Sequence, residues 1–152
     1  ETNVAAAKMH ANRSHLLIDY RATTVETMDT RERFDIVLAM EVVEHVTDVG
    51  LFLDRCAALT KPTGLLVLAT LNRTMKSFAL AIVGAEYILR WLPRGTHEYA
   101  KFIKPSELAQ HCRDAGLTPR SLIGMSYNPI TKVYALNDDV GVNYLVHCVR
   151  DA

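Results

Sequence analysis

Two carboxylates and an imidazole stand close together in the segment "LAMEVVEHVTD", at the end of an apolar run. Glu41, Glu44 and His45 are spaced i, i+3 and i+4, and on a helix this spacing places all three side chains on one face. Carboxylate oxygens and an imidazole nitrogen can hold a divalent cation and leave coordination positions for water or a substrate. These three residues are therefore candidate metal ligands.

A purely structural role would explain the same residues. The positive end of the helix dipole favours acidic side chains in a first helical turn, and a histidine there can hydrogen-bond to the backbone. The zincin signature is absent, and no distant third ligand is evident in the sequence. The spacing alone leaves both interpretations open.

The elements that must position these residues follow from the hydrophobic pattern. Short apolar runs typical of buried parallel strands occur at 15–21, 33–40 and 65–72. Between them, residues 23–30 can form one or two helical turns, and residues 47–64 a helix that stops at a Pro and a Gly. This alternation predicts a doubly wound α/β sheet with helices on both faces.

The rest of the chain departs from simple alternation. Helices are expected at 1–14, at 77–93 and, with a proline in its first turn and a glycine stop, at 104–117. Two later runs, 121–128 and 142–150, are expected to form an antiparallel strand pair that closes the sheet. Ligands of open α/β sheets bind beyond the carboxyl ends of the strands, which is where Glu41 should lie.

Composition limits the function classes. With 152 residues, 49% of them hydrophobic, the chain can bury the core of one globular domain. Seventeen basic and 17 acidic residues balance, so no nucleic-acid partner is expected. Three widely spaced cysteines suit buried thiols in a reducing compartment. No signal peptide or membrane-spanning run is recognisable, so we expect a cytoplasmic location.

Longer motifs carry a family resemblance. The strand "FDIVLAM" followed by "EVVEHV" resembles the fourth strand and following motif of class I S-adenosylmethionine-dependent methyltransferases. Two further segments, "TLNRTMKSFALAIVGAEYILRWLPRGTHEYAKFIKPSEL" and "GMSYNPITKVYAL…DDVGVNYL", resemble the bacterial ubiquinone-biosynthesis O-methyltransferase family. This resemblance covers nearly the whole chain.

The resemblance implies an activity and a set of site residues. Members of the family methylate hydroxyl groups of polyprenylated catechol or hydroxyphenol intermediates, with S-adenosylmethionine as methyl donor. Met40, and less strongly Ala22 in the turn "YRATT", match positions that line the cofactor pocket. Glu41, Glu44 and His45 match the family's metal motif, usually assigned to magnesium. The resemblance assigns no catalytic base.

An insertion at about 73–104 suggests how a lipid-like substrate reaches the site. Its segment 77–93 has an apolar face with flanking basic residues and is too short to span a bilayer. Two interpretations stay open: a helix lying in the membrane interface, or a lid over the site. We expect a peripheral protein of the bacterial inner membrane that can also contact other ubiquinone-biosynthesis proteins.

One feature departs from the family pattern. The glycine-rich loop and the acidic residue that bind the cofactor in class I methyltransferases are not found, so residues 1–152 are expected to be the C-terminal two-thirds of a single methyltransferase domain that lacks its N-terminal strands here. This leaves an alternative function, a non-catalytic methyltransferase-like module that binds lipid or partner proteins at the membrane surface.

Overall fold

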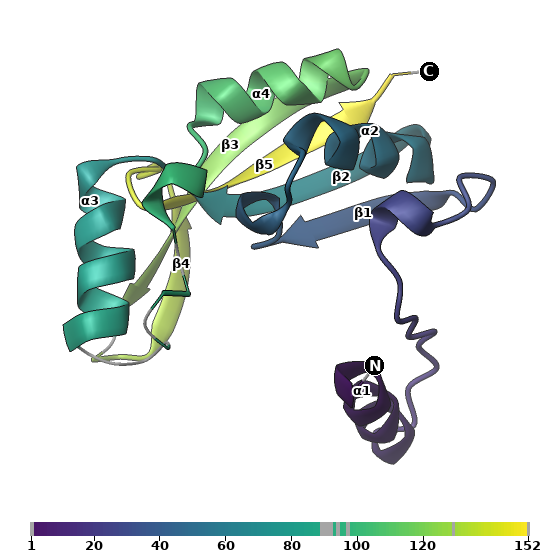
Figure 1. Ribbon diagram of the computed structural model, residues 1–152, viewed down its shortest axis with the longest axis horizontal. Coiled ribbons are helices and arrows are strands. Elements are labelled where there is room, and N and C mark those ends of the chain that lie inside the picture. The colour runs from purple at the N-terminus through teal and green to yellow at the C-terminus, as the bar shows by residue number, and fades with distance from the viewer. Residues whose placement is uncertain (1, 89–92, 94, 97, 129, 152) are drawn as a thin grey trace.

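The sheet combines one parallel strand pair with antiparallel neighbours. The computed structural model describes residues 2–88, 93, 95–96, 98–128 and 130–151 (Figure 1). Within these residues the sheet order is β1-β2-β5-β3-β4. β1 and β2 are parallel, whereas β5 pairs antiparallel with β2 and β3, and β3 pairs antiparallel with β4. The strands are β1 (Phe34–Met40), β2 (Thr60–Leu71), β3 (Leu117–Asn128), β4 (Val133–Asn137) and β5 (Asn143–Arg150).

Helices of several kinds connect the strands. Three connections contain short 3-10 helices (η1, η2 and η4), and the π-helix η3 continues directly from α3. The helical elements are α1 (Thr2–Arg13), η1 (Val25–Thr27), η2 (Val43–His45), α2 (Val49–Leu59), α3 (Met75–Ser77), η3 (Phe78–Ile88), η4 (Tyr99–Lys101) and α4 (Pro105–Asp114).

Local signals set the ends of the two helices that pack on the sheet. The Asp48 side chain accepts a hydrogen bond from the Leu51 N–H at 2.9 Å and caps the start of α2. Pro105 begins α4, where its missing N–H costs nothing, and Gly116 follows the helix at φ 72°. The expected helices at 47–64 and 104–117 are thus confirmed, although α2 ends at Leu59 and β2 starts at the next residue.

The core lies between the sheet and these two helices, which contact each other on one face of the sheet. Leu53 of α2, Leu66 and Leu68 of β2, and Leu108 of α4 are fully buried there. Tyr144 of β5 is also fully buried, and its hydroxyl donates a 2.8 Å hydrogen bond to the carbonyl oxygen of Ile103. This bond satisfies the phenol and fixes the segment before α4 against the sheet.

The free thiols agree with the sequence-based expectation. Cys56, Cys112 and Cys148 are all buried and unbridged. Burial raises the pKa of the Cys56 thiol to about 12, which keeps it protonated at neutral pH. These cysteines act as small apolar side chains of the core.

In the N-terminal region the expected helix is present, whereas the expected strand is not. Residues 15–21 form no strand, because in the described part of the chain no strand pairs with the far edge of β1, and Leu17 is completely exposed. The expected helix 1–14 is present as α1, but it lies apart from the sheet (Figure 1). The helices packed on the described sheet therefore cover one face rather than both.

The C-terminal strand pair is confirmed, with one addition. β3 and β5 pair antiparallel as expected. Between them the structure forms β4, where no strand was expected. The apolar side chains of β4 are exposed, so they lack the buried alternation that identifies a strand in sequence.

The insertion is partly helical. α3 and η3 account for its first half, and residues 89–92, 94 and 97 lie outside the described residues. The expected helix 77–93 therefore falls partly outside them. Among the described helices none has the length and apolar character needed to cross a membrane.

Candidate active site at the end of strand β1

Glu41 stands where the parallel strand pair ends. Met40 is in register with Ala69 of β2, and the Glu41 N–H donates a 2.9 Å hydrogen bond to the Ala69 carbonyl oxygen. At this residue φ is 53°, a left-handed conformation uncommon for a residue with a side chain. The chain turns there into η2, which carries Glu44. A strained backbone conformation persists only where the surrounding structure holds it, and such residues are common at functional sites.

Glu44 is a buried carboxyl with one oxygen satisfied and one not. Only 3% of the residue is exposed. The Thr70 hydroxyl donates a 2.7 Å hydrogen bond to its Oε2, whereas its Oε1 is buried and has no hydrogen-bond partner. A buried carboxylate oxygen without a donor is costly, and a hydrogen-bond donor or a cation would compensate it.

Glu41 lies beside Glu44 at the exposed rim of the site. The pKa of Glu41 is raised to about 7, mainly because the surrounding protein desolvates its carboxyl, and also because the Glu44 charge and a hydrogen bond with Glu44 favour the protonated form. Near neutral pH, therefore, the Glu41 carboxyl is partly protonated. A bound cation would compensate the charge of both carboxyls.

His45 is placed differently from the two carboxyls. It ends η2, and its side chain is exposed. In the described residues no group of three or more His, Cys, Asp or Glu side chains is arranged to hold a metal ion. The structure thus brings Glu41 and Glu44 together, while a site that includes His45 stays a prediction.

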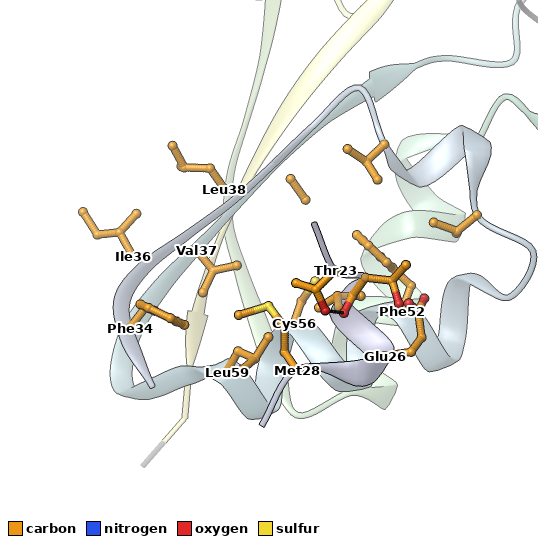
Figure 2. A pocket seen from close by; sticks show the side chains of 15 residues that line it. Thr23, Glu26, Met28, Phe34, Ile36, Val37, Leu38, Phe52, Cys56 and Leu59 are labelled. Atoms are coloured by element: carbon orange, nitrogen blue, oxygen red, sulfur yellow. Dashed lines mark hydrogen bonds between the residues drawn. The ribbon is translucent and has the colours of Figure 1, made fainter. Parts of the chain in front are cut away.

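A cavity of about 520 Å³ opens along β1, and its lining includes Val42, the residue after Glu41. Its wall is mostly apolar, and the Thr23 and Thr24 hydroxyls and the Glu26 carboxyl supply polar groups (Figure 2). The lining residues are Thr23, Thr24, Val25, Glu26, Met28, Phe34, Ile36, Val37, Leu38, Ala39, Val42, Val46, Phe52, Cys56 and Leu59. An apolar cleft with a few polar groups is the usual form of a small-molecule site.

The two residues expected to line a cofactor pocket border this cavity without lining it. Ala22 precedes Thr23 and Met40 follows Ala39, and in each case the neighbour lines the wall. Their role as cofactor contacts stays a prediction.

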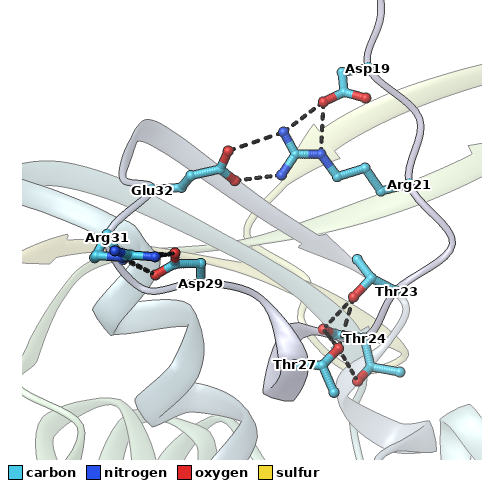
Figure 3. Close-up of polar contacts among 8 residues, drawn as sticks. All are labelled: Asp19, Arg21, Thr23, Thr24, Thr27, Asp29, Arg31 and Glu32. Atoms are coloured by element: carbon cyan, nitrogen blue, oxygen red, sulfur yellow. Dashed lines mark hydrogen bonds and ion pairs between the residues drawn. The ribbon is translucent and has the colours of Figure 1, made fainter.

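Polar contacts hold the segment 19–32, which supplies the polar groups of the cavity wall (Figure 3). Arg21 donates two hydrogen bonds to Glu32, of 2.5 and 3.1 Å, and one of 2.7 Å to Asp19. The Thr23 and Thr27 hydroxyls are 2.8 Å apart and hydrogen-bonded. The ion pairs are exposed and contribute little to stability, so their main effect is to position this segment beside the cavity.

The geometry of an α/β sheet with acidic residues at the carboxyl end of a strand agrees with the comparisons with known proteins. A family model described as "Methyltransferase domain" matches residues 4–122. The chain belongs to the methyltransferase domain family. This domain is 65% identical over 145 residues to the ubiquinone biosynthesis O-methyltransferase of Rhodopseudomonas palustris strain BisB18, and 62% identical over 146 residues to the protein of that name from Bradyrhizobium diazoefficiens.

These relatives are longer than the domain described here. The first match covers 95% of this chain and 57% of the relative, and the second covers 96% and 58%. The methyltransferase domain thus spans a little over half the length of the curated relatives that it matches.

Solved structures show that the fold is that of class I S-adenosylmethionine-dependent methyltransferases. An S-adenosylmethionine-dependent methyltransferase from Clostridium acetobutylicum has a TM-score of 0.68 at 8% identity, covering 98% of this chain and 71% of that one. Magnesium protoporphyrin IX methyltransferase from Synechocystis, solved with S-adenosylhomocysteine, has a TM-score of 0.65 at 15% identity, covering 97% and 59%. At these identities the likeness concerns the fold alone.

Sequence analysis missed one residue of the site, Thr70. Its contact with Glu44 joins residues 26 positions apart and depends on the parallel register of β1 and β2. The available signal was a polar residue within the apolar run of β2, close to the carboxyl end of that strand.

Proposed function

We propose that this methyltransferase domain is part of an enzyme that transfers a methyl group from S-adenosylmethionine to a hydroxyl group of a polyprenylated catechol or hydroxyphenol in ubiquinone biosynthesis. The names of the relatives and the family membership support this assignment. The observation that carries it is the Glu41–Glu44 pair at the carboxyl end of β1, next to a cavity of small-molecule size.

The residues present suit a divalent cation, and we propose magnesium. The buried Oε1 of Glu44 has no hydrogen-bond partner and is free to bind a cation, and the adjoining Glu41 adds a second hard oxygen donor. Glu41 and Glu44 would hold the ion, with His45 as a third candidate ligand. When bound, the cation supplies charge that lowers the pKa of a neighbouring phenol from its ordinary value of about 10.

The chain's own residues would position the reaction. Thr70 fixes the orientation of the Glu44 carboxyl, and the left-handed turn at Glu41 directs the adjoining carboxyl from the strand end. The apolar wall along β1 offers the reactants a surface with few polar groups. S-adenosylmethionine, when bound, supplies the electrophilic methyl group, so the protein's task is chiefly to align two reactants.

We place the adenosyl part of the cofactor in the cavity along β1. The Thr23 and Thr24 hydroxyls and the Glu26 carboxyl line its polar side, with Ala22 and Met40 adjoining. Hydrogen bonds from its own backbone N–H and from Thr24 lower the pKa of Glu26, so this carboxyl is ionised at neutral pH and can accept hydrogen bonds. Apolar side chains on the opposite wall provide a surface for a flat aromatic base.

The proposed substrate also implies a location. A polyprenyl tail partitions into a bilayer, so we propose peripheral association with the cytoplasmic side of the inner membrane through 77–93. Among the described residues of that segment, Phe78, Leu80 and Val83 are exposed apolar side chains. Contacts with other ubiquinone-biosynthesis proteins at that surface are part of the same proposal.

Methyl transfer tests this function directly. The protein as its gene encodes it is incubated with radiolabelled S-adenosylmethionine and a short-tailed catechol, with and without a chelator. We expect labelled product that falls strongly on chelation and recovers with added magnesium. Absence of turnover with every catechol and hydroxyphenol tried would refute the enzymatic proposal and favour the non-catalytic module, whereas turnover unaffected by the chelator would refute only the cation.

A further inference from the structure

The hairpin formed by β3 and β4 carries several exposed apolar side chains. It extends beyond the part of the sheet that α2 and α4 cover (Figure 1). Ile130, in its turn, is 90% exposed. The other large apolar side chains exposed along the hairpin are Tyr127, Val133, Tyr134 and Leu136, and together with Ile130 they form what we call the hairpin surface.

The turn of this hairpin satisfies its own backbone groups. The Asn128 side-chain oxygen accepts hydrogen bonds from the N–H groups of Ile130 and Thr131, at 2.9 and 3.2 Å. The Asn128 carbonyl oxygen accepts a 2.8 Å hydrogen bond from the Lys132 N–H. These donors would not lose partners on leaving water, and an unsatisfied backbone group is the main cost of placing a loop in a lipid environment.

Two tyrosines lie on the strands next to the turn. Tyr127 and Tyr134 are in register across the two strands, with ring centroids 4.6 Å apart. Tyrosine has an apolar ring and a polar hydroxyl, so it is favoured where an apolar phase meets water. The hairpin thus has an isoleucine at its tip and an aromatic pair one step further back.

Acidic residues are absent from the hairpin and occur only at its base. Residues 115–137 contain no Asp or Glu, while Arg120 and Lys132 are exposed cations. The first acidic residues, Asp138 and Asp139, follow the end of β4. A hairpin with its acidic charge at the base alone suits an anionic surface that meets it tip first.

The base of the hairpin is fastened to the segment that begins α3. Lys76 forms a 2.5 Å ion pair with Asp139, and the Thr74 hydroxyl donates a 2.6 Å hydrogen bond to the Gly141 carbonyl oxygen. The helical segment that follows exposes apolar side chains of its own, Phe78 and Leu80 among them. Both elements lie at the same end of the molecule (Figure 1).

We propose that the β3–β4 hairpin is a second membrane anchor, which inserts Ile130 and its tyrosine pair into the interface of an anionic lipid bilayer beside the helical segment 75–88. A bilayer fits better than a protein partner because the exposed side chains lie on and beside a projecting turn rather than in a groove, and because the hairpin has no acidic residue before Asp138. The proposal rests on the proposed function only in that a polyprenylated substrate resides in a membrane.

A single environment-sensitive label tests the insertion. The three cysteines of residues 1–152 are buried, so Ile130→Cys adds an accessible thiol for a nitrobenzoxadiazole (NBD) dye, and the protein without this substitution gives the background labelling. The matched control is Leu51→Cys on α2, another exposed apolar position on a different element. Each labelled protein, in the form that its gene encodes, is mixed with phosphatidylglycerol vesicles or with phosphatidylcholine vesicles, and its emission is recorded.

We expect the label at 130 to brighten and shift to shorter wavelength with phosphatidylglycerol vesicles, and the label at 51 to stay unchanged. Ile130→Glu should weaken co-sedimentation with these vesicles by roughly tenfold, while Leu51→Glu should not. Methylation of a water-soluble catechol should be retained in Ile130→Glu.

Three results would overturn the anchor. The first is binding to vesicles with an unchanged signal at 130. The second is equal brightening at both labelled positions. The third is a signal at 130 that follows self-association in light scattering without any lipid. Because the soluble-catechol assay reports the enzymatic proposal separately, failure of the anchor can be distinguished from failure of the proposed function.

Discussion

Replacing Glu44 by Gln is the most informative single change at the site. The amide oxygen can still accept the 2.7 Å hydrogen bond from the Thr70 hydroxyl, so the local packing is preserved. The substitution removes a buried charge whose Oε1 has no partner and places an N–H donor beside Glu41. An unsatisfied buried acceptor costs about 1–3 kcal/mol. In the absence of a cation, therefore, the variant should be more stable than the wild type.

The magnitude can be stated for a thermal melt at pH 8 in a chelator, where Glu41 is mostly ionised. A gain of about 1–2 kcal/mol corresponds to a rise in Tm of roughly 2–8 °C for a chain of this size. Magnesium should stabilise the wild type more than the Glu44→Gln variant. At a hundred times its Kd it stabilises the wild type by about 2.7 kcal/mol, or roughly 5–10 °C, and it should leave the Glu44→Gln variant nearly unchanged.

Glu98→Gln is the matched control, because the Glu98 side chain is 65% exposed and its ion pair with Lys101 lies on the surface. Its Tm and its response to magnesium should match those of the wild type. The reasoning would be refuted if Glu44→Gln were destabilised in the chelator, or if magnesium raised the Tm of Glu44→Gln as much as that of the wild type.

Three further outcomes are expected. Because the folded-state pKa of Glu41 is raised above its unfolded value, the wild type should lose stability as the pH rises from about 4.5 through 7, and Glu41→Gln should remove this loss in urea titrations at pH 5 and pH 8; an equal pH dependence of the two proteins would contradict it. Tyr144→Phe should lower the free energy of unfolding by about 0.5–1.5 kcal/mol in the same titrations, since it removes the bond to Ile103; no change would mean that this bond does not form in solution. Val42→Trp, which fills the cavity along β1, should weaken S-adenosylhomocysteine binding about tenfold by calorimetry, and unaltered affinity would place the cofactor elsewhere.

Elements defined by burial and local stop signals could be predicted from the sequence. The strand before Glu41 is an apolar run of the right length, and α4 has a proline at its start and a glycine after its end. Residues 15–21 have the same apolar character but form no strand, because a strand also requires a partner to receive its hydrogen bonds. Local pattern reports the composition of a segment and does not report whether a neighbour is present.

The residues of the candidate site likewise include some that the sequence could identify and one that it could not. Glu41 and Glu44 could be identified because they are close in sequence and follow a recognisable strand. Thr70 could not, since it reaches Glu44 only through the pairing of β1 with β2. The exposed hairpin at 127–134 was also missed, because its apolar residues face outward, where no burial pattern guides a prediction.

Anomalous diffraction from crystals grown with manganese and S-adenosylhomocysteine would test most directly whether the end of β1 holds a divalent cation for methyl transfer. We expect a manganese peak between the Glu41 and Glu44 carboxyls, at about 2.1 Å from the buried Oε1 of Glu44. A map that places manganese elsewhere, or that shows only solvent between these two carboxyls while the cofactor is bound, would contradict the proposed site.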